Sequence, residues 1–383
     1  MAEVIHIKTN PEVLKWARDS LVLSKPKAAE STLISISRLE QLENGEKYPS
    51  MDELKSMAKT YNRTVATLLL QKPPKEKPLP KDRRTIDSAK LDIFHEKTIM
   101  VVRKARALVS SLIELKEEAG LPIQPFQFRA NIEESPVAIS HKLRIEWELD
   151  EFRQLENVND ALDAYIEHVE SLGVAVFQLS LTQDNLRGFS IIDEQMPVIS
   201  IKRGGEQPTA KIFTLFHELG HILLNEGGIC DINFDPNAKQ IEKWCNAFAA
   251  ELLVPSAQLL KMNLVRQYVS KNEKNWAKKD LVELANHFHV GPLAILRCLL
   301  ENNLTTSAFY KEKHDAWSKP TFGISKTPEG RNIPKETIKE RGRTYISLAF
   351  KAFDQNKIDL KDLSDFLGVK LSYIPKTRQL LNA

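Results

Sequence analysis

The spacing of hydrophobic residues constrains this chain most, because it is helical along nearly all of the 383 residues and β-like in one interval only. Near the start, Leu14, Ala17 and Leu21 recur at three- and four-residue intervals, as on one face of a helix. Three short runs bounded by Gly, Pro or Asp are typical of strands, at 173–179, 188–192 and 197–202. We therefore predict a mostly helical α+β fold with one small sheet.

Composition excludes several broad classes of protein. Hydrophobic residues make up 42% and charged residues 27%, as in soluble globular chains rather than disordered ones. No apolar run approaches the roughly 18 to 20 residues of a membrane span, and the first residues lack the layout of a signal peptide. The three cysteines form no C-x-x-C pair, which fits a reducing compartment. We expect a cytoplasmic protein that does not enter a membrane.

The net charge of +3 is unevenly distributed along the chain. Residues 1–84 carry +5, residues 85–317 carry −8 and residues 318–383 carry +6. Basic segments attract phosphate, whereas an acidic segment repels it. DNA is therefore a possible partner of the two ends but not of the middle.

The pattern divides the chain into four parts. Residues 72–84 hold four prolines and six basic residues and are typical of an extended linker. We therefore divide it into residues 1–71, a linker at 72–87, residues 88–310 and a basic helical region at 311–383. No internal repeat is evident. The expected helices beyond the linker lie at 97–118, 158–172, 208–225, 238–253, 280–302, 336–354 and 359–367.

A metal-binding motif lies within the predicted helix 208–225. His217 and His221 are four residues apart, so both imidazoles lie on one helix face and can bind one Zn²⁺. Glu218 follows the first histidine and can reach a water on the metal, as the general base of a hydrolase does. The motif predicts a zinc-dependent hydrolase.

A catalytic zinc site needs a third protein ligand. Glu242 is our choice, because it lies on a later predicted helix about 20 residues downstream. Asn246, one turn further on, could hydrogen-bond a ligand histidine. Glu251 is the main competitor for the third ligand position, and Asp231 is a weaker one because it lies in a loop.

The predicted strand 197–202 directly precedes the motif helix. An edge strand beside such a site can bind an extended peptide and hold its carbonyl over the metal. This arrangement favours peptide substrates. A donor that stabilises the oxyanion is also expected, and its candidates are Arg203, His287 and His289, each of which is more often a surface or packed residue.

Cys230 and Cys245 resemble metal ligands by type only. Cys245 follows a tryptophan in an apolar helix and Cys230 stands alone. A small buried hydrophobic role is expected for both.

Two segments, 213–221 and 241–255, resemble the ImmA/IrrE family of zinc metallopeptidases. The resemblance extends to 14–18, 42–49 and 54–58, which look like the helix-turn-helix module that often precedes this peptidase. The resemblance implies a helix-turn-helix-like domain at 1–71 and a zincin-like metallopeptidase domain with accessory helices at 88–310. It implies that His217, His221 and Glu242 are metal ligands and that Glu218 is the general base. Members of the family typically cut a repressor or another DNA-binding partner, which implies a protein substrate in a transcriptional, stress or phage-defence circuit. The alternative is a DNA-binding or protein-interaction regulator whose zinc site is structural or inactive.

DNA binding by the first domain has thin support. The expected recognition segment, 31–43, has Arg38 against Glu40 and Glu43, and residues 1–71 carry only +1. The glycine usual in the inter-helix turn is missing near Leu33. A protein-docking or dimerising role is equally consistent with these residues.

Two further segments invite comparison with DNA-binding proteins. Residues 281–297 repeat the helix-turn-helix layout, although a helical hairpin that packs on the catalytic domain is the simpler interpretation. The basic tail could contact nucleic acid or an acidic partner, although a solvated helix face is the simpler interpretation. Its cations lie around a predicted helix start and are Lys335, Lys339, Arg341 and Arg343.

Overall fold

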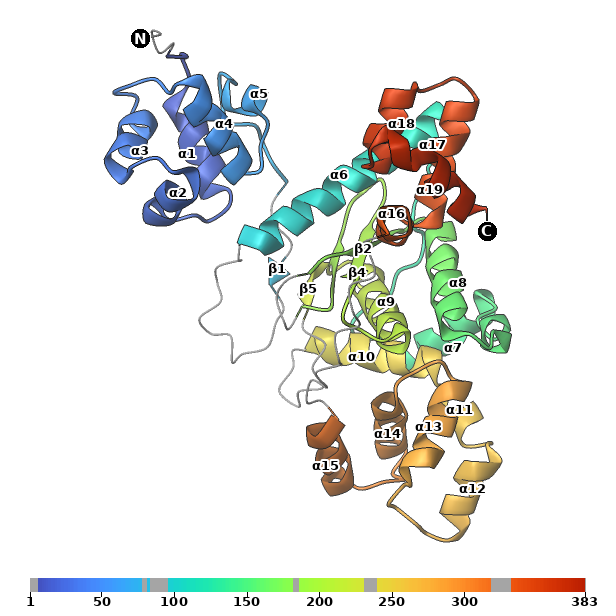
Figure 1. Cartoon of the computed structure of the whole chain (residues 1–383). Helices are drawn as coiled ribbons and strands as arrows, with labels where there is room; N and C mark the ends of the chain where they lie inside the picture. The colour runs from blue at the N-terminus through green and yellow to red at the C-terminus, as the bar shows by residue number, and fades with distance from the viewer. Residues whose placement is uncertain are drawn as a thin grey trace. The chain divides into compact units, whose positions relative to one another are not determined.

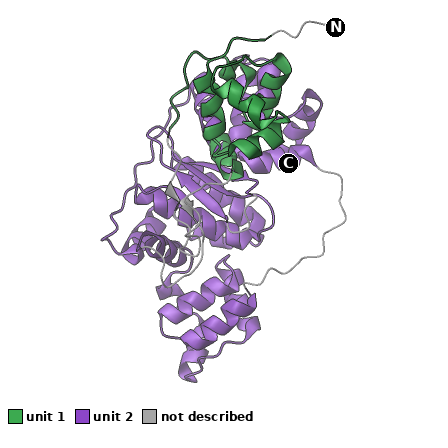
Figure 2. Ribbon diagram, turned by 90° about the vertical axis from the view of Figure 1, so that its left-hand side faces the viewer, with its two compact units in different colours: residues 1–79, 86–104 green, residues 80–85, 105–383 purple. Residues whose placement is uncertain are grey.

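The structure is a computed structural model that describes residues 6–77, 81–82, 96–181, 186–230, 240–317 and 332–382. The chain separates into two compact units, residues 1–79 with 86–104 and residues 80–85 with 105–383 (Figure 2). Helices predominate and one small sheet is present, so the predicted mostly helical α+β class is confirmed. None of the described helices is long and apolar enough to cross a bilayer.

The first unit is a small bundle of short helices whose starts are capped by polar side chains. Each helix from α1 to α5 has an Asn, Ser or Thr that accepts a hydrogen bond from a backbone N–H of the first turn. Ser50 and Glu53 form a capping box at the start of α4. Buried leucines, with Tyr61, form the core between the helices. The helices are α1 (Pro11–Asp19), α2 (Lys25–Thr32), α3 (Ile36–Glu43), α4 (Met51–Thr60) and α5 (Val65–Leu68).

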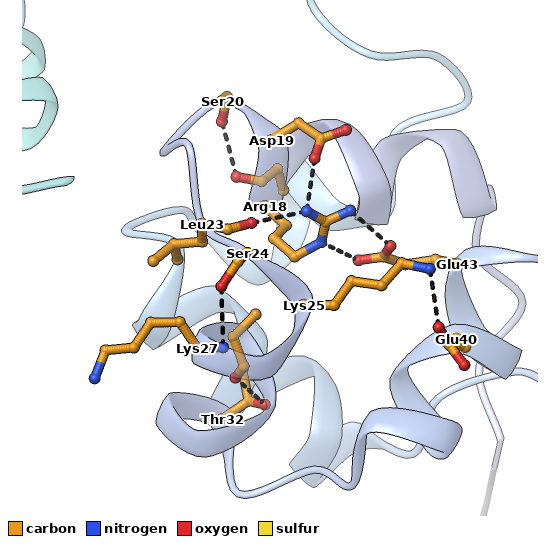
Figure 3. Close-up of polar contacts among 12 residues, drawn as sticks. Arg18, Asp19, Ser20, Leu23, Ser24, Lys25, Lys27, Thr32, Glu40 and Glu43 are labelled. Atoms are coloured by element: carbon orange, nitrogen blue, oxygen red, sulfur yellow. Dashed lines mark hydrogen bonds and ion pairs between the residues drawn. The ribbon is translucent and has the colours of Figure 1, made fainter. Parts of the chain in front are cut away.

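A buried ion pair joins α1 to α3 (Figure 3). The guanidinium of Arg18 donates from Nε and Nη2 to the two oxygens of Glu43, at 2.7 and 2.9 Å. Its Nη1 donates to the carbonyl of Leu23 at 2.8 Å. Removing one partner of such a buried pair typically costs about 3–5 kcal/mol. Glu43 is therefore part of the architecture of the unit rather than of a nucleic-acid surface.

The second unit contains a five-stranded sheet with the order β1-β5-β3-β4-β2. β2 runs parallel to β4, β3 is antiparallel to both β4 and β5, and β1 is parallel to β5. Helix α8 (Val158–Ser171) contacts α9 (Pro208–Leu223) and β2, and α9 contacts β3 and β4 (Figure 1). The strands are β1 (Lys81–Asp82), β2 (Ala175–Leu179), β3 (Gly188–Ile191), β4 (Val198–Lys202) and β5 (Gly228–Cys230).

The sheet differs from the predicted one in two respects. It has two extra strands of two and three residues, β1 and β5, which are too short to produce an alternating pattern. The strand before the motif helix, β4, lies between β3 and β2 and is not an edge. The expectation that this strand binds a peptide by its free edge was wrong, because both of its edges are already paired.

The predicted helices around the sheet are present, with one division, whereas α7, α11, α12 and α15 were not predicted. The predicted helix 280–302 is two helices, α13 and α14, with His289 in the left-handed conformation between them (φ 54°). Together with α11, α12 and α15 they follow the helix that carries Glu242. The bounds are α6 (Glu96–Glu118), α7 (Pro136–Glu146), α8 (Val158–Ser171), α9 (Pro208–Leu223), α10 (Gln240–Leu253), α11 (Ser256–Leu259), α12 (Asn263–Ser270), α13 (Lys278–His287), α14 (Pro292–Glu301) and α15 (Ser307–Trp317), with a 3₁₀ turn at Glu151–Gln154.

The described residues 332–382 contain four α-helices. The predicted helix 336–354 is broken at Gly342, whose φ of 85° and ψ of 153° no helix can contain. A Cβ at this position would also lie 2.9 Å from Oε1 of Glu170 on α8. The helices are α16 (Ile333–Arg341), α17 (Arg343–Asp354), α18 (Leu360–Leu367) and α19 (Ile374–Leu381), with a 3₁₀ turn at Leu371–Tyr373; α19 was not predicted.

Candidate metal centre

Helix α9 is the central element of the second unit. Every residue from Lys211 to Leu223 on it is buried, which fits a helix that is apolar on almost all sides. His217 and His221 are fully buried, one turn apart, with their rings 5.0 Å apart between centroids. The sequence thus places two imidazoles on one face of a rigid helix.

Helix α10 packs closely against α9 because α9 carries a glycine at the contact. A Cβ at Gly220 would lie 3.2 Å from Sγ of Cys245 and 3.3 Å from its Cα. Cys245 is fully buried and therefore acts as a small packing residue, as expected. The side chain of Cys230 lies outside the described residues. The close approach of the two helices brings Glu242, near the start of α10, to the histidines.

Three ligand atoms converge at this contact. Nε2 of His217 and Nε2 of His221 are 3.2 Å apart, and the carboxylate oxygens of Glu242 lie 3.3 Å from the first and 3.4 Å from the second. Ligands bound at 2.0–2.1 Å to one tetrahedral zinc ion are about 3.3 Å apart. The spacing therefore fits a metal ion held by His217, His221 and Glu242, and these form the one group among the described residues that could hold a metal.

Glu218 lies beside this triangle and beneath the sheet. It is fully buried, and its Oε1 would be 3.1 Å from a Cβ at Gly188 of β3. Burial raises the pKa of Glu218 well above its ordinary value, and the carboxylate of Glu242 adds to the rise, while the Ser190 hydroxyl opposes it. The carboxyl is thus held where a proton is readily accepted, as a general base requires.

Glu242 behaves in the opposite way. Burial favours its neutral form, but hydrogen bonding and charge from His217 and His221 outweigh burial and lower its pKa below the ordinary value. An ionised carboxylate facing two imidazoles is the donor set that binds zinc. The two buried carboxyls therefore differ in the way that a ligand and a base must differ.

Among the described residues, neither Asn246 nor Glu251 belongs to the metal-binding group. Asn246 is on α10 and nearly buried, and its Oδ1 forms no hydrogen bond within the described part of the chain, so its orienting role stays a prediction. Glu251 instead accepts hydrogen bonds from the backbone N–H and the hydroxyl of Ser256, at 2.9 and 2.7 Å. Asp231 lies outside the described residues.

The oxyanion candidates have other contacts. Arg203 forms an ion pair with Glu340 of α16 at 2.8 Å and donates a hydrogen bond to Ser180. His287 ends α13, and His289 occupies the turn that follows it. None of the three belongs to the metal-binding group, and their oxyanion role stays a prediction.

Two residues of β3 beside Glu218, Gly188 and Ser190, were not predicted from the sequence. Gly188 lets the strand approach Glu218, because a Cβ there would come within 2.7 Å of Cγ2 of Thr214 on α9. Ser190 places its buried hydroxyl beside Glu218. A glycine inside a strand is a known sign of close approach, but the sequence does not say what approaches.

Two buried histidines and a buried glutamate at ligand spacing, with a second buried glutamate beside them, are the residue types of a metal-dependent peptidase site. Residues 169–299, about a third of the chain, match the family profile of the IrrE N-terminal-like domain, a peptidase family. The match includes α9 and α10 and supports a metallopeptidase of the IrrE type in this part of the chain. No curated protein matches the chain.

Proposed function

We propose that this protein is a zinc-dependent endopeptidase that cleaves a protein partner involved in the control of transcription, such as a repressor. The observation that carries the proposal is the triangle of His217, His221 and Glu242, with ligand spacings of 3.2–3.4 Å and Glu218 beside it. The family match supports peptide bonds as the substrate class. The repressor-like partner follows from the resemblance of the sequence to ImmA/IrrE proteins.

The residues of the site have separate roles in metal binding and in proton transfer. A bound zinc ion supplies Lewis-acid polarisation of the scissile carbonyl and of water. Glu218, whose pKa is raised by burial, accepts the proton from the attacking water and passes it to the leaving amine. His217, His221 and Glu242 hold the metal, and the buried walls of α9 and β3 exclude bulk water from the proton transfer.

Glu218→Gln tests the mechanism, because it retains the shape of the side chain and removes its basicity. We expect zinc content to persist while cleavage falls by a factor of roughly 10² to 10⁴. Cleavage is measured as new protein N-termini in cells that express the wild-type chain together with the product of its neighbouring gene. Zinc is measured by elemental analysis of the purified protein.

Glu194→Gln is the matched control, since Glu194 is an exposed carboxylate between β3 and β4. It should retain both zinc and cleavage. If Glu218→Gln produced the same new N-termini as the wild type, the peptidase proposal would fail. A protein that binds zinc but generates no such N-termini in either form would instead support a regulator with a structural zinc site.

A further inference from the structure

One helix-turn-helix pattern occurs three times among the described residues. In each copy a residue with positive φ separates two helices: Leu33 (59°), His289 (54°) and Gly368 (62°). The same kinds of small or apolar side chains recur at fixed positions relative to this residue. These positions are five, four and one residues before it and one, six and nine residues after it. They are Ala28, Ala29, Thr32, Ile34, Leu39 and Leu42; Leu284, Ala285, Phe288, Val290, Ile295 and Cys298; and Leu363, Ser364, Leu367, Val369, Ile374 and Thr377, all of them buried except the half-buried Ser364.

The repeat is not evident in the sequence because its copies differ in residue identity. The three copies share burial and backbone conformation rather than residue identity, and the left-handed position is Leu, His or Gly. In a helix-turn-helix the residues before and after the turn pack the two helices together, and the outer face of the second helix remains free. The question is then which second helix, α3, α14 or α19, is equipped to meet a ligand.

Helix α14 is enclosed by its neighbours. It contacts α13, α15 and α10, and its Arg297 forms an ion pair with Glu301 and lies over the ring of Tyr310. Of its ten residues only Glu301 is exposed, so the helix presents no free face to a groove of DNA. The second copy is therefore a helical hairpin with a packing role, as the simpler interpretation of residues 281–297 predicted.

Helix α3 is accessible, but its charges are already paired. Arg38 donates from two nitrogens to the carboxylate of Glu53, at 2.8 and 2.9 Å. Glu40 pairs with Lys25, and Glu43 is buried against Arg18. The exposed side chains at the start of this helix include Leu33 and Ile36, which are apolar. This surface offers little to phosphate.

Helix α19 differs from both. From residue 366 to the end of the chain there is no acidic residue, while Lys370 and Lys376 are exposed before and on the helix. Arg378 forms an ion pair with Asp354. The acidic residues of this copy lie on the first helix, where Asp359 and Asp362 form the capping box of α18; Asp365 is also exposed there.

The turn of this copy contains a glycine and accepts a hydrogen bond from an arginine of α16. Gly368 adopts φ 62° without the strain that a side chain would meet there, and Arg341 of α16 donates from Nε to the carbonyl of Leu367 at 2.8 Å. The arginine caps α18 and fixes the turn that leads to α19. Gln379 is exposed on α19 and has the amide group that reads a base edge.

We propose that α18 and α19 form a DNA-binding helix-turn-helix, with α19 in the major groove of duplex DNA and Lys370 and Lys376 against its phosphates. The proposal does not depend on the peptidase activity. It assigns to the C-terminal segment the role that the sequence resemblance suggests for the N-terminal unit.

The test measures binding of the full chain to a fluorescent pool of random-sequence duplexes by anisotropy, from 50 to 200 mM salt. The variant is Lys370→Glu with Lys376→Glu, and the matched control is Lys27→Glu with Lys55→Glu, two exposed lysines of the N-terminal unit. We expect the first variant to bind roughly tenfold or more weakly and its salt slope to fall by about two, because two phosphate contacts are lost. The control should bind as the wild type does.

Both lysines are exposed, so the variants should fold, and Lys370→Ala with Lys376→Ala repeats the test without reversed charge. Equal melting temperatures and zinc contents establish that the chains are intact. Three results would overturn the proposal: no binding of duplex DNA by the wild type at 50 mM salt, equal losses in both variants, or a loss confined to the Lys27 and Lys55 variant.

Discussion

Glu242 is the residue on which the assignment of the metal centre depends. The two histidines come from one motif, but the third ligand had Glu251 and Asp231 as competitors in the sequence. In the structure Glu242 lies within 3.4 Å of both imidazoles, whereas Glu251 accepts a hydrogen bond from the hydroxyl of Ser256. The difference arises from tertiary packing, because α9 and α10 are separate in sequence and meet at Gly220.

Replacing each candidate separately tests the assignment. We expect Glu242→Ala to weaken zinc binding by more than about 100-fold, since losing even a group that only orients a ligand costs 10- to 100-fold. Glu251→Ala should retain zinc and lose the contacts of Glu251 with Ser256 and His141. Competition with a chromophoric chelator measures both affinities. Normal affinity in the Glu242 variant, with loss in the Glu251 variant, would reverse the assignment.

The surroundings of Glu218 could not be predicted from the sequence. His217, Glu218 and His221 follow from local spacing, because a helix fixes which residues share a face. Gly188 and Ser190 lie some thirty residues earlier, and their position depends on the register of β3 against β4. Register is set by long-range pairing and not by any pattern within the strand.

Among the elements, helices were predicted best and short strands worst. The stripes at 158–172 and 238–253 correspond to α8 and α10, since three or more turns give a clear period. β1 and β5 are two and three residues long and lack a period. The break between α16 and α17 was missed because helical spacing of apolar residues continues across Gly342 while its backbone does not.

Gly342 provides a test at this level. We expect Gly342→Ala to lower the free energy of unfolding by about 1–3 kcal/mol, because its φ and ψ lie in a region that essentially only glycine occupies. Gly204→Ala is the control, since a Cβ there meets no atom within 4 Å and its effect should stay within about 0.5 kcal/mol. Urea denaturation measures both. Equal changes in the two variants would show that the break carries no strain.

For the molecule as a whole, metal and stability should be linked. The site buries two carboxyls and two imidazoles in the core of the second unit, where a cation offsets their cost. At a zinc concentration 100 times Kd, binding adds about 2.7 kcal/mol to stability.

Chelation should therefore lower the Tm of this unit by roughly 5–10 °C. Zinc should restore the Tm and magnesium should not, because magnesium prefers oxygen ligands. Differential scanning calorimetry measures the shift, and Glu242→Ala serves as a chain that chelation should leave unchanged. A wild-type Tm that is insensitive to chelation would contradict a metal centre in the folded protein.

The charge of the whole chain has a physical interpretation once the fold is known. Residues 1–71, which carry +1, pair some of their cations internally, as Arg38 is paired with Glu53. The basic C-terminal segment leaves Lys370 and Lys376 exposed. The sequence supplied the uneven distribution of charge, but not which cations are already neutralised, because that depends on side chains far apart in sequence.

The contact at Gly220 has a consequence for how this metal centre can vary between related proteins. The distance between the two ligand-bearing helices is limited by the volume of one residue that binds nothing. A larger residue there would push Cys245, and with it α10, away from the histidines. A chain could therefore keep every ligand and still lose the site, so the presence of the ligands alone does not identify an active relative.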